Sequence, residues 1–220
     1  MLTISSRVMV SDEATLILCD GVVLTCAQGI DVGDHKLTVF VQSVGDGKLV
    51  ANAPAQTTAI YGNVAICGGI IEAKGGIGPG NALGGDGIGD AGKQVLIGGG
   101  NVTARGGEGQ RGGRNQNGGD GGSGLRGTIV IQGLAYVNAY GGNGGHCGIS
   151  NGTALNGGNG GDGITGDIKG YGAVNAVGGT GDDGSSGRVN GQDGTPGQAI
   201  SGEHSNVTIS PRKRCVQQIP

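Results

Sequence analysis

The aspartate with the clearest metal-binding context is Asp162, in the segment GGNGGDGIT (157–165). This segment fits the nonapeptide Gly-Gly-x-Gly-x-Asp-x-apolar-x, in which an aspartate and backbone carbonyls bind Ca²⁺ between stacked turns. The motif works in tandem, but GGDGGSGLR (118–126) has Ser123 in the aspartate position, and the acids of GGDGIGDAG (84–92) are out of frame. Asp162 is therefore the candidate calcium ligand, with a chance match in a glycine-rich chain as the alternative.

Basic and aromatic side chains suggest a second chemistry, the binding of an acidic glycan. Arg105 holds the same position in a repeated segment as Lys74 and Tyr140, and further arginines lie at 111, 114 and 126. If these arginines form a stripe, Lys74, Arg105, Arg111 and Tyr140 are the candidate ligand-binding residues, and the alternative is a solvated face. The basic tail PRKRC (211–215) is short and the net charge is −3, which argues against nucleic acid as a partner.

Residues that could catalyse a reaction are few and scattered. His146 and Cys147 could form a nucleophile or a metal pair, but both lie in a glycine run with no obvious third member. Asp182 and Asp183 are adjacent, and neighbours in an extended segment point apart. Polysaccharide-cleaving enzymes need clustered carboxylates and aromatic platforms. The sequence therefore favours a non-enzymatic protein, with a polysaccharide lyase or hydrolase as the alternative.

The five cysteines, at 19, 26, 67, 147 and 215, contain no Cys-x-x-Cys pair, so no zinc ribbon is predicted. Their odd number argues against a simple disulfide framework. Cys19, Cys26 and Cys67 fall within or next to expected strands and are interpreted as small core residues.

An internal repeat must position all of these residues. The frame apolar-x-Ala-x-Gly-Gly-x-Gly occurs in IEAKGGIG (71–78), VTARGGEG (102–109), VNAYGGNG (137–144) and VNAVGGTG (174–181). A second apolar run precedes each copy, in VAI (64–66), VLI (95–97), TIVI (128–131) and the weaker DIKG (167–170), and NVTI (206–209) opens a partial copy. Self-similarity at this period is the mark of a repeat architecture. The first 60 residues carry the same strand–turn–strand frame, as in TLILCDGVVLTC (15–26), so one continuous fold is expected.

The composition rules out an ordinary core, because 55 of the 220 residues are glycine and only 2 % are aromatic. Glycine usually contributes about 7 %. Glycines recur at every third residue in several runs, for example at 118, 121, 124 and 127, at 157, 160, 163 and 166, and at 178, 181, 184 and 187. Three residues per turn is the period of polyproline-II geometry, which places these glycines on one edge where backbones can approach closely. Side chains between them, such as that of Asn159, are expected to point to solvent or a groove. The alternatives are a disordered linker and long flexible loops.

The combined pattern predicts an all-β protein, a right-handed parallel β-helix (β-solenoid) with short polyglycine-II segments. We expect strand-rich repeats over 1–75, glycine-rich repeats over 76–205, and a terminal strand and tail over 206–220.

The segment TLILCDGVVLTCAQGIDVGDHKLTVFVQSVGDGKLVA, followed by GGNVTARGGEG, resembles the glycine-rich β-helix repeats of bacterial cell-surface proteins. The match covers about residues 12–145, while the glycine runs after 141 are more similar in composition to the polyglycine-II segments of phage tail-fibre adhesins. The resemblance implies a solenoid stalk or binding surface without catalytic residues.

These expectations give a location and partners. MLTISSRVMVSDE has no apolar signal-peptide core, and no run approaches the length of a membrane helix. We expect an extracellular, cell-surface or virion-surface module, adhesive or structural, whose partner is a cell-surface glycan or another protein. Self-association along the repeat axis is a further expectation.

Overall fold

The computed structural model describes residues 1–186, 189–205 and 208–209. Within these residues the chain is all-β, contains no helix, and so has no helix that could cross a membrane. Gly187, Cys215, the tail 211–215 and the first half of the predicted strand 206–209 lie outside the described residues.

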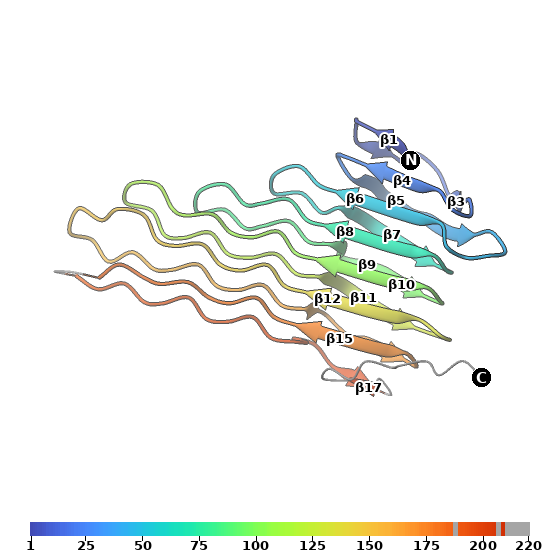
Figure 1. Ribbon diagram of the computed structural model, residues 1–220. Coiled ribbons are helices and arrows are strands. Elements are labelled where there is room, and N and C mark those ends of the chain that lie inside the picture. The colour runs from blue at the N-terminus through green and yellow to red at the C-terminus, as the bar shows by residue number, and fades with distance from the viewer. Residues whose placement is uncertain (187–188, 206–207, 210–220) are drawn as a thin grey trace.

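Two parallel sheets carry the strands (Figure 1). Sheet A has eight strands, in the spatial order β1 (Leu2–Ile4), β4 (Val23–Cys26), β6 (Lys48–Asn52), β8 (Ile70–Lys74), β10 (Asn101–Arg105), β12 (Tyr136–Tyr140), β15 (Ala173–Val177) and β17 (Thr208–Ile209). Sheet B has nine strands, which are β2 (Val8–Met9), β3 (Ala14–Leu18), β5 (Ile30–Val41), β7 (Ile60–Ile66), β9 (Ile88–Ile97), β11 (Leu125–Ile131), β13 (Ile164–Thr165), β14 (Ile168–Gly170) and β16 (His204–Ser205).

The chain alternates between the sheets. A strand of sheet B, a short turn and a strand of sheet A are followed by a hairpin that returns to sheet B, and we call this unit a repeat. Each strand pairs in parallel with its equivalent in the next repeat. The predicted strand pairs 64–66/71–73, 95–97/102–104 and 128–131/137–139 are therefore confirmed, and the weaker run 167–170 is strand β14.

The core lies between the sheets and follows from the alternation within each strand. In sheet A the apolar position of the frame forms a buried column of Leu49, Ile71, Val102, Val137 and Val174. The alanine position forms a second column, Ala51, Ala73, Ala104 and Ala139, also buried. Sheet B faces them with fully buried residues that include Ile66, Ile97 and Ile131. With hardly any aromatic residue, these aliphatic columns supply the hydrophobic stabilisation.

The hairpins between the sheets form a separate part of the molecule, which we call the glycine layer (75–87, 106–124, 141–163 and the described residues of 178–199). Figure 1 shows these hairpins as undulating chains that extend away from the strands, longer in the later repeats than in the earlier ones. The interval between strands is 7 residues (53–59) in an early repeat, then 13 (75–87) and 19 (106–124). Each hairpin has an outgoing leg that continues sheet A and a returning leg that leads into sheet B.

Two backbone rules hold the glycine layer together. The first glycine of a Gly-Gly-x triplet donates its N–H to a third-position carbonyl in the same leg of the next repeat, as Gly121 does to Asn159 (2.8 Å). The second glycine donates to the opposite leg, so that Gly122 bonds to Gly107, Gly142 to Gly122, and Gly161 to Gly142, each at 2.8 Å. A Cβ on Gly121 or Gly160 would overlap the carbonyl of Gly142 or Gly179. The expected contact of period-three glycines with neighbouring backbones is therefore confirmed for these two positions.

The third position of the triplet uses its side chain, which corrects our expectation for Asn159. Its Oδ1 accepts the N–H of Thr195 (2.9 Å), the equivalent residue of the next repeat. The same bond joins Asn117 to Asn156, Asp120 to Asn159, Asn143 to Thr180, Asn156 to Gln192, Asp162 to Gln198 and Asp86 to Ser123. We call this series the Asx ladder. The Asx ladder provides an acceptor for the N–H of the third residue of each triplet, which the two glycine hydrogen bonds do not involve. This is why short Asn and Asp side chains recur at this position.

The period-three runs are shorter than predicted. Gly127 and Gly166 do not continue them, because both have positive φ (119° and 116°). Gly127 lies within β11 at the register shift between Arg126 and Thr128. Such a backbone conformation favours glycine over residues with a Cβ, and the register shift marks a β-bulge.

Candidate functional site

The outer surface of sheet A carries three of the four predicted ligand-binding residues. Lys74, Arg105 and Tyr140 are directly paired on β8, β10 and β12, with Asn52 and Val177 at the two ends of the row. The predicted register of these residues across the repeats is thus confirmed. Neighbouring strands are about 4.8 Å apart, so their side chains form one continuous row.

Arg105 and Tyr140 form a stacked pair. The guanidinium carbon of Arg105 lies 4.3 Å from the centroid of the Tyr140 ring, a cation–π arrangement. The Tyr140 hydroxyl accepts a hydrogen bond from Asn175 Nδ2 (3.3 Å), and that amide also donates to Asn138 Oδ1 (3.2 Å). The hydrogen bond from Asn175 holds the Tyr140 ring in place, and the ring in turn positions the Arg105 guanidinium.

Two shallow hollows meet at this row, and we call the surface they share the cationic face. One, of about 390 Å³, is lined by Lys74, Arg105, Glu108, Tyr140, Asn143, Val177 and glycine backbone of the outgoing legs. The other, of about 410 Å³, is lined by Val50, Asn52, Glu72, Ala73, Lys74, Thr103 and Arg105. Glu72 is paired with Lys48 (2.8 Å), whereas Lys74 and Arg105 form no ion pair with any described residue. Two unpaired cations and one stacked ring therefore face the solvent together.

The remaining arginines do not extend this face, so the predicted stripe is wrong. Arg111 lies near the tip of the hairpin 106–124, where its Nε donates to the carbonyl of Cys147 (3.3 Å). Arg114 faces the side chain of Asn151, also at a tip. Arg126 belongs to sheet B and pairs with Asp86 (3.4 Å). Positions within one glycine run diverge in space because the hairpin reverses between them.

Asp162, the predicted calcium ligand, is a member of the Asx ladder. Its Oδ1 accepts the N–H of Gln198 (2.7 Å) and its Oδ2 accepts the hydroxyl of Thr165 (3.1 Å). The aspartate of the nonapeptide-like segment thus has a structural use that needs no metal, and calcium binding at Asp162 stays a prediction.

His146 lies close to Asp182 and Asp183, two neighbours that the sequence did not predict. It lies across from Asp183 in the next repeat, and its ring and the carboxylates of Asp182 and Asp183 offer ligand atoms within 4.8 Å of one another. The expectations that His146 lacks a third partner and that the two aspartates point apart are therefore wrong. Nδ1 lies 3.1 Å from the Asp183 carbonyl, and Asp182 Oδ1 already accepts the Asp183 N–H (2.7 Å). The cluster is largely solvent-exposed.

The cysteines behave differently from one another. Cys26 is buried, and burial raises the pKa of its thiol. Cys19 and Cys67 are exposed, so their interpretation as core residues is wrong. Both follow the last residue of a sheet B strand, where the chain turns outward. The four described cysteines are free thiols, and Cys147 is buried in the glycine layer.

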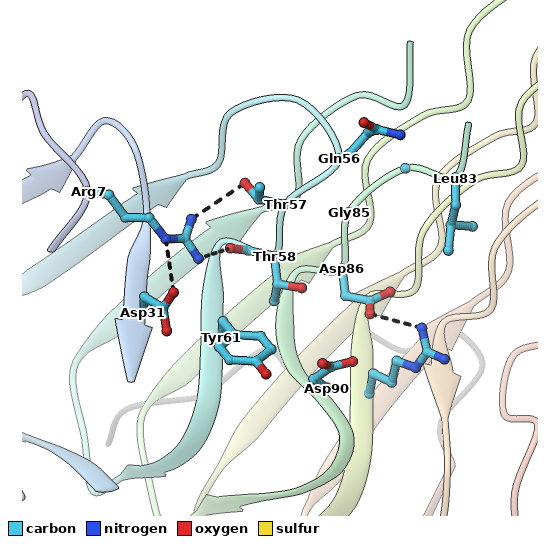
Figure 2. A pocket seen from close by; sticks show the side chains of 12 residues that line it. Arg7, Asp31, Gln56, Thr57, Thr58, Tyr61, Leu83, Gly85, Asp86 and Asp90 are labelled. Carbon is cyan, nitrogen blue, oxygen red and sulfur yellow. Dashed lines mark hydrogen bonds and ion pairs between the residues drawn. The ribbon is translucent and has the colours of Figure 1, made fainter. Parts of the chain in front are cut away.

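A polar pocket of about 420 Å³ lies where sheet B meets the returning legs (Figure 2). Its lining consists of Arg7, Asp31, Gln56, Thr57, Thr58, Tyr61, Leu83, Gly84, Gly85, Asp86, Asp90 and Arg126. In Figure 2, Thr58, Tyr61 and Asp90 occupy the middle of the view, between Asp31 on one side and Asp86 on the other. The residues come from widely separated positions in the sequence, and sequence reasoning did not find the pocket.

Asp86 is the most buried acidic residue of the pocket, at 5 % exposure. Its Oδ1 accepts the N–H of Ser123 (2.7 Å) through the Asx ladder, and its Oδ2 lies 3.4 Å from Arg126 Nη1. Burial raises the pKa of this carboxyl above its usual range, against the opposing effects of the Ser123 hydrogen bond and Arg126.

Comparison with protein-family models, curated proteins and solved structures finds no match to this chain. The geometry of the two surfaces therefore carries the functional argument.

Proposed function

We propose that the chain is a non-enzymatic, surface-exposed repeat module, adhesive or structural, that binds an acidic glycan on the cationic face. The observation that carries this proposal is the row Lys74, Arg105 and Tyr140, in which two neighbouring cations have no ion-pair partner among the described residues and the second of them stacks on the tyrosine ring. A planar guanidinium recognises carboxylate or sulfate geometry, and a tyrosine supplies an apolar contact for a sugar ring.

The shape of the face supports an extended ligand. The two hollows share Lys74 and Arg105, so a chain of sugar units could cross several strands while it keeps contact with both cations. Thr103, Asn138 and Asn175 lie in the adjacent row and offer hydroxyl and amide groups to ligand hydroxyls. Repeated contacts of this kind add up along a rigid surface.

We propose in addition that the two sheets and the glycine layer are parts of a right-handed parallel β-helix with short polyglycine-II segments. The parallel register between successive repeats and the period-three backbone hydrogen bonds support this assignment. Such a rigid repetitive body suits a place at a cell or virion surface, as the resemblance to bacterial surface repeats implies.

The direct test measures binding and turnover on the same polymer. We expect the chain to bind polygalacturonate and to bind its methyl-esterified, uncharged form at least fivefold more weakly. No new reducing ends or unsaturated products should accumulate over hours. Equal binding of both polymers would overturn the charge-based recognition, and product release at catalytic rates would favour the polysaccharide lyase or hydrolase.

Variants locate the binding. Lys74→Gln and Arg105→Gln should each weaken polygalacturonate binding several-fold. Lys36→Gln is the matched control, because Lys36 is likewise an exposed lysine on a strand but belongs to sheet B. An equal loss in the control would indicate that net charge alone, and not the cationic face, attracts the polymer.

A further inference from the structure

We propose that the polar pocket between sheet B and the returning legs is a second binding site, which takes an amino sugar. This site is separate from the cationic face and differs from it in sign. Three carboxylates (Asp31, Asp86, Asp90) and two guanidiniums (Arg7, Arg126) line the pocket, which leaves it with a surplus of negative charge.

Part of this charge is already used within the protein. Arg7 donates to the carbonyls of Gln28 (3.2 Å) and Thr58 (3.4 Å) and pairs with Asp31 (3.5 Å). Asp31 Oδ1 also accepts the N–H of Gly33 (3.0 Å). Arg7 and Asp31 therefore already have hydrogen-bond and ion-pair partners within the protein, and they line one side of the pocket.

Two carboxylate oxygens are left with weak partners or none. Asp86 Oδ2 has a single long contact, 3.4 Å to Arg126, although its side chain is almost fully buried. Asp90 Oδ1 accepts a hydrogen bond from the N–H of its neighbour Ala91 (2.7 Å). Among the described residues, the other oxygen of Asp90 has no hydrogen-bond donor. The buried Asp86 and the half-buried Asp90 thus keep unused acceptor capacity, which suits a cationic donor, and an ammonium group has three N–H bonds to offer.

The rest of the lining suits a hydroxylated ring. Thr57, Thr58 and Gln56 present polar groups at the pocket, and Tyr61 presents an aromatic ring that can pack on the apolar face of a sugar. Tyr61 and Asp90 line the same pocket (Figure 2), so one ligand can meet the ring and the carboxylate together. Lys93 lies 5.9 Å from the centroid of the Tyr61 ring and pairs with Asp34; it attracts Asp90 electrostatically but forms no ion pair with it.

The test is a titration of the isotope-labelled whole chain, followed by amide NMR shifts. Glucosamine, with its amino group protonated, should give saturable shifts at residues 56–61 and 84–90. N-Acetylglucosamine has nearly the same ring but no charge and should bind about tenfold more weakly, the worth of one charge-assisted hydrogen bond. The amine 1,5-diaminopentane carries the charge without the ring and should also bind more weakly than glucosamine.

Variants with matched charge complete the test. Asp90→Asn should weaken glucosamine binding at least fivefold. Asp86→Asn should do the same without breaking the Asx ladder, because its Oδ1 can still accept the Ser123 N–H. Asp120→Asn removes the same charge from another ladder position, outside the pocket, and should leave binding unchanged. Lys74→Gln should also have no effect, so failure here and failure of the cationic face can be distinguished.

Three results would overturn the proposal. The first is equal affinity for glucosamine and N-acetylglucosamine, the second is diamine binding as tight as that of glucosamine, and the third is an equal loss in Asp120→Asn and Asp90→Asn.

Discussion

The two sheets and the glycine layer are built on the same repeat but are stabilised in opposite ways. In the sheets, side chains are buried in columns such as Ile66, Ile97 and Ile131, and the backbone bonds from strand to strand in one direction, along each sheet. In the glycine layer, the backbone itself is buried and bonds in two directions, while third-position side chains such as those of Asp120 and Asn159 bond to the backbone of the next repeat. The comparison teaches that a chain with few large apolar residues can still form a dense interior, provided that hydrogen bonds replace side-chain burial.

The largest effect should come from a Cβ inside the glycine layer. Gly121→Val would overlap the Gly142 carbonyl and separate neighbouring legs. Overpacking costs about 1–3 kcal/mol and each lost hydrogen bond about 0.5–1.5 kcal/mol, so we expect a loss of about 4 kcal/mol. For a chain of this size, thermal melting should fall by about 8–16 °C. Thr180→Val, at an exposed third position of the outgoing leg, is the control and should melt near the wild type. Equal melting of the two variants would mean that the layer is a set of ordinary loops.

The next effect should come from the sheet core. Ile97→Ala removes a fully buried side chain and should cost about 3 kcal/mol, or about 6–12 °C in thermal melting. Leu96→Ala, the adjacent outward-facing position on β9, should cost clearly less. If the Leu96 variant melted as low as the Ile97 variant, the assignment of the inner and outer faces of sheet B would be wrong.

A smaller effect should come from the Asx ladder. Asn159→Ala removes the acceptor of the Thr195 N–H and should cost about 1 kcal/mol, or about 2–4 °C. Asn159→Asp keeps an acceptor oxygen and should recover most of this loss. Thr180→Ala, whose side chain has no ladder bond, should be neutral. If Asn159→Ala melted at the same temperature as the wild type, the third-position N–H groups would need no protein acceptor.

The smallest effect should be a pH dependence at Asp86. Burial raises the pKa of this carboxyl in the folded chain above its unfolded value, so the folded state holds the proton more tightly. Its favourable contribution is present below the unfolded pKa and is lost as the pH rises through the raised folded pKa. Compared with Asp86→Asn, the wild type should therefore lose melting temperature as the pH rises above the unfolded pKa of the carboxyl. A difference between the two that stays constant over this range would contradict the assignment.

The sequence predicts the strands well because their signal is local. The frame apolar-x-Ala gives both the buried columns of sheet A and their register, and it also places Lys74, Arg105 and Tyr140 in one row. The close approach of Gly121 and Gly160 to other backbones follows from the period alone.

The Asx ladder and the polar pocket could not be obtained in the same way. The partner of Asn159 is Thr195, and the partner of Asp86 is Ser123, so each bond joins two repeats whose relative offset depends on hairpin length. The recurrence of Asn and Asp after Gly-Gly is a local signal of the ladder, but from the sequence alone the segment around Asp162 predicts calcium binding instead. Arg126 was misplaced for a related reason, since a hairpin tip separates it from Arg105 and puts it on the other sheet.

The lengthening of the hairpins restricts how such a protein can change in evolution. The legs of one hairpin must match those of its neighbours triplet by triplet, so a leg can grow only by whole triplets. One triplet in each leg is six residues, which is the step from the interval 53–59 to 75–87 and again from 75–87 to 106–124. The next interval, 141–163, is only four residues longer than 106–124, so its tip must take up the difference. Insertions of six residues would extend a hairpin and keep every existing bond, whereas insertions of one or two would shift the phase of a leg unless the tip absorbed them. The legs of the glycine layer can thus lengthen by whole triplets, with the tip taking up any remainder, independently of the number of strands.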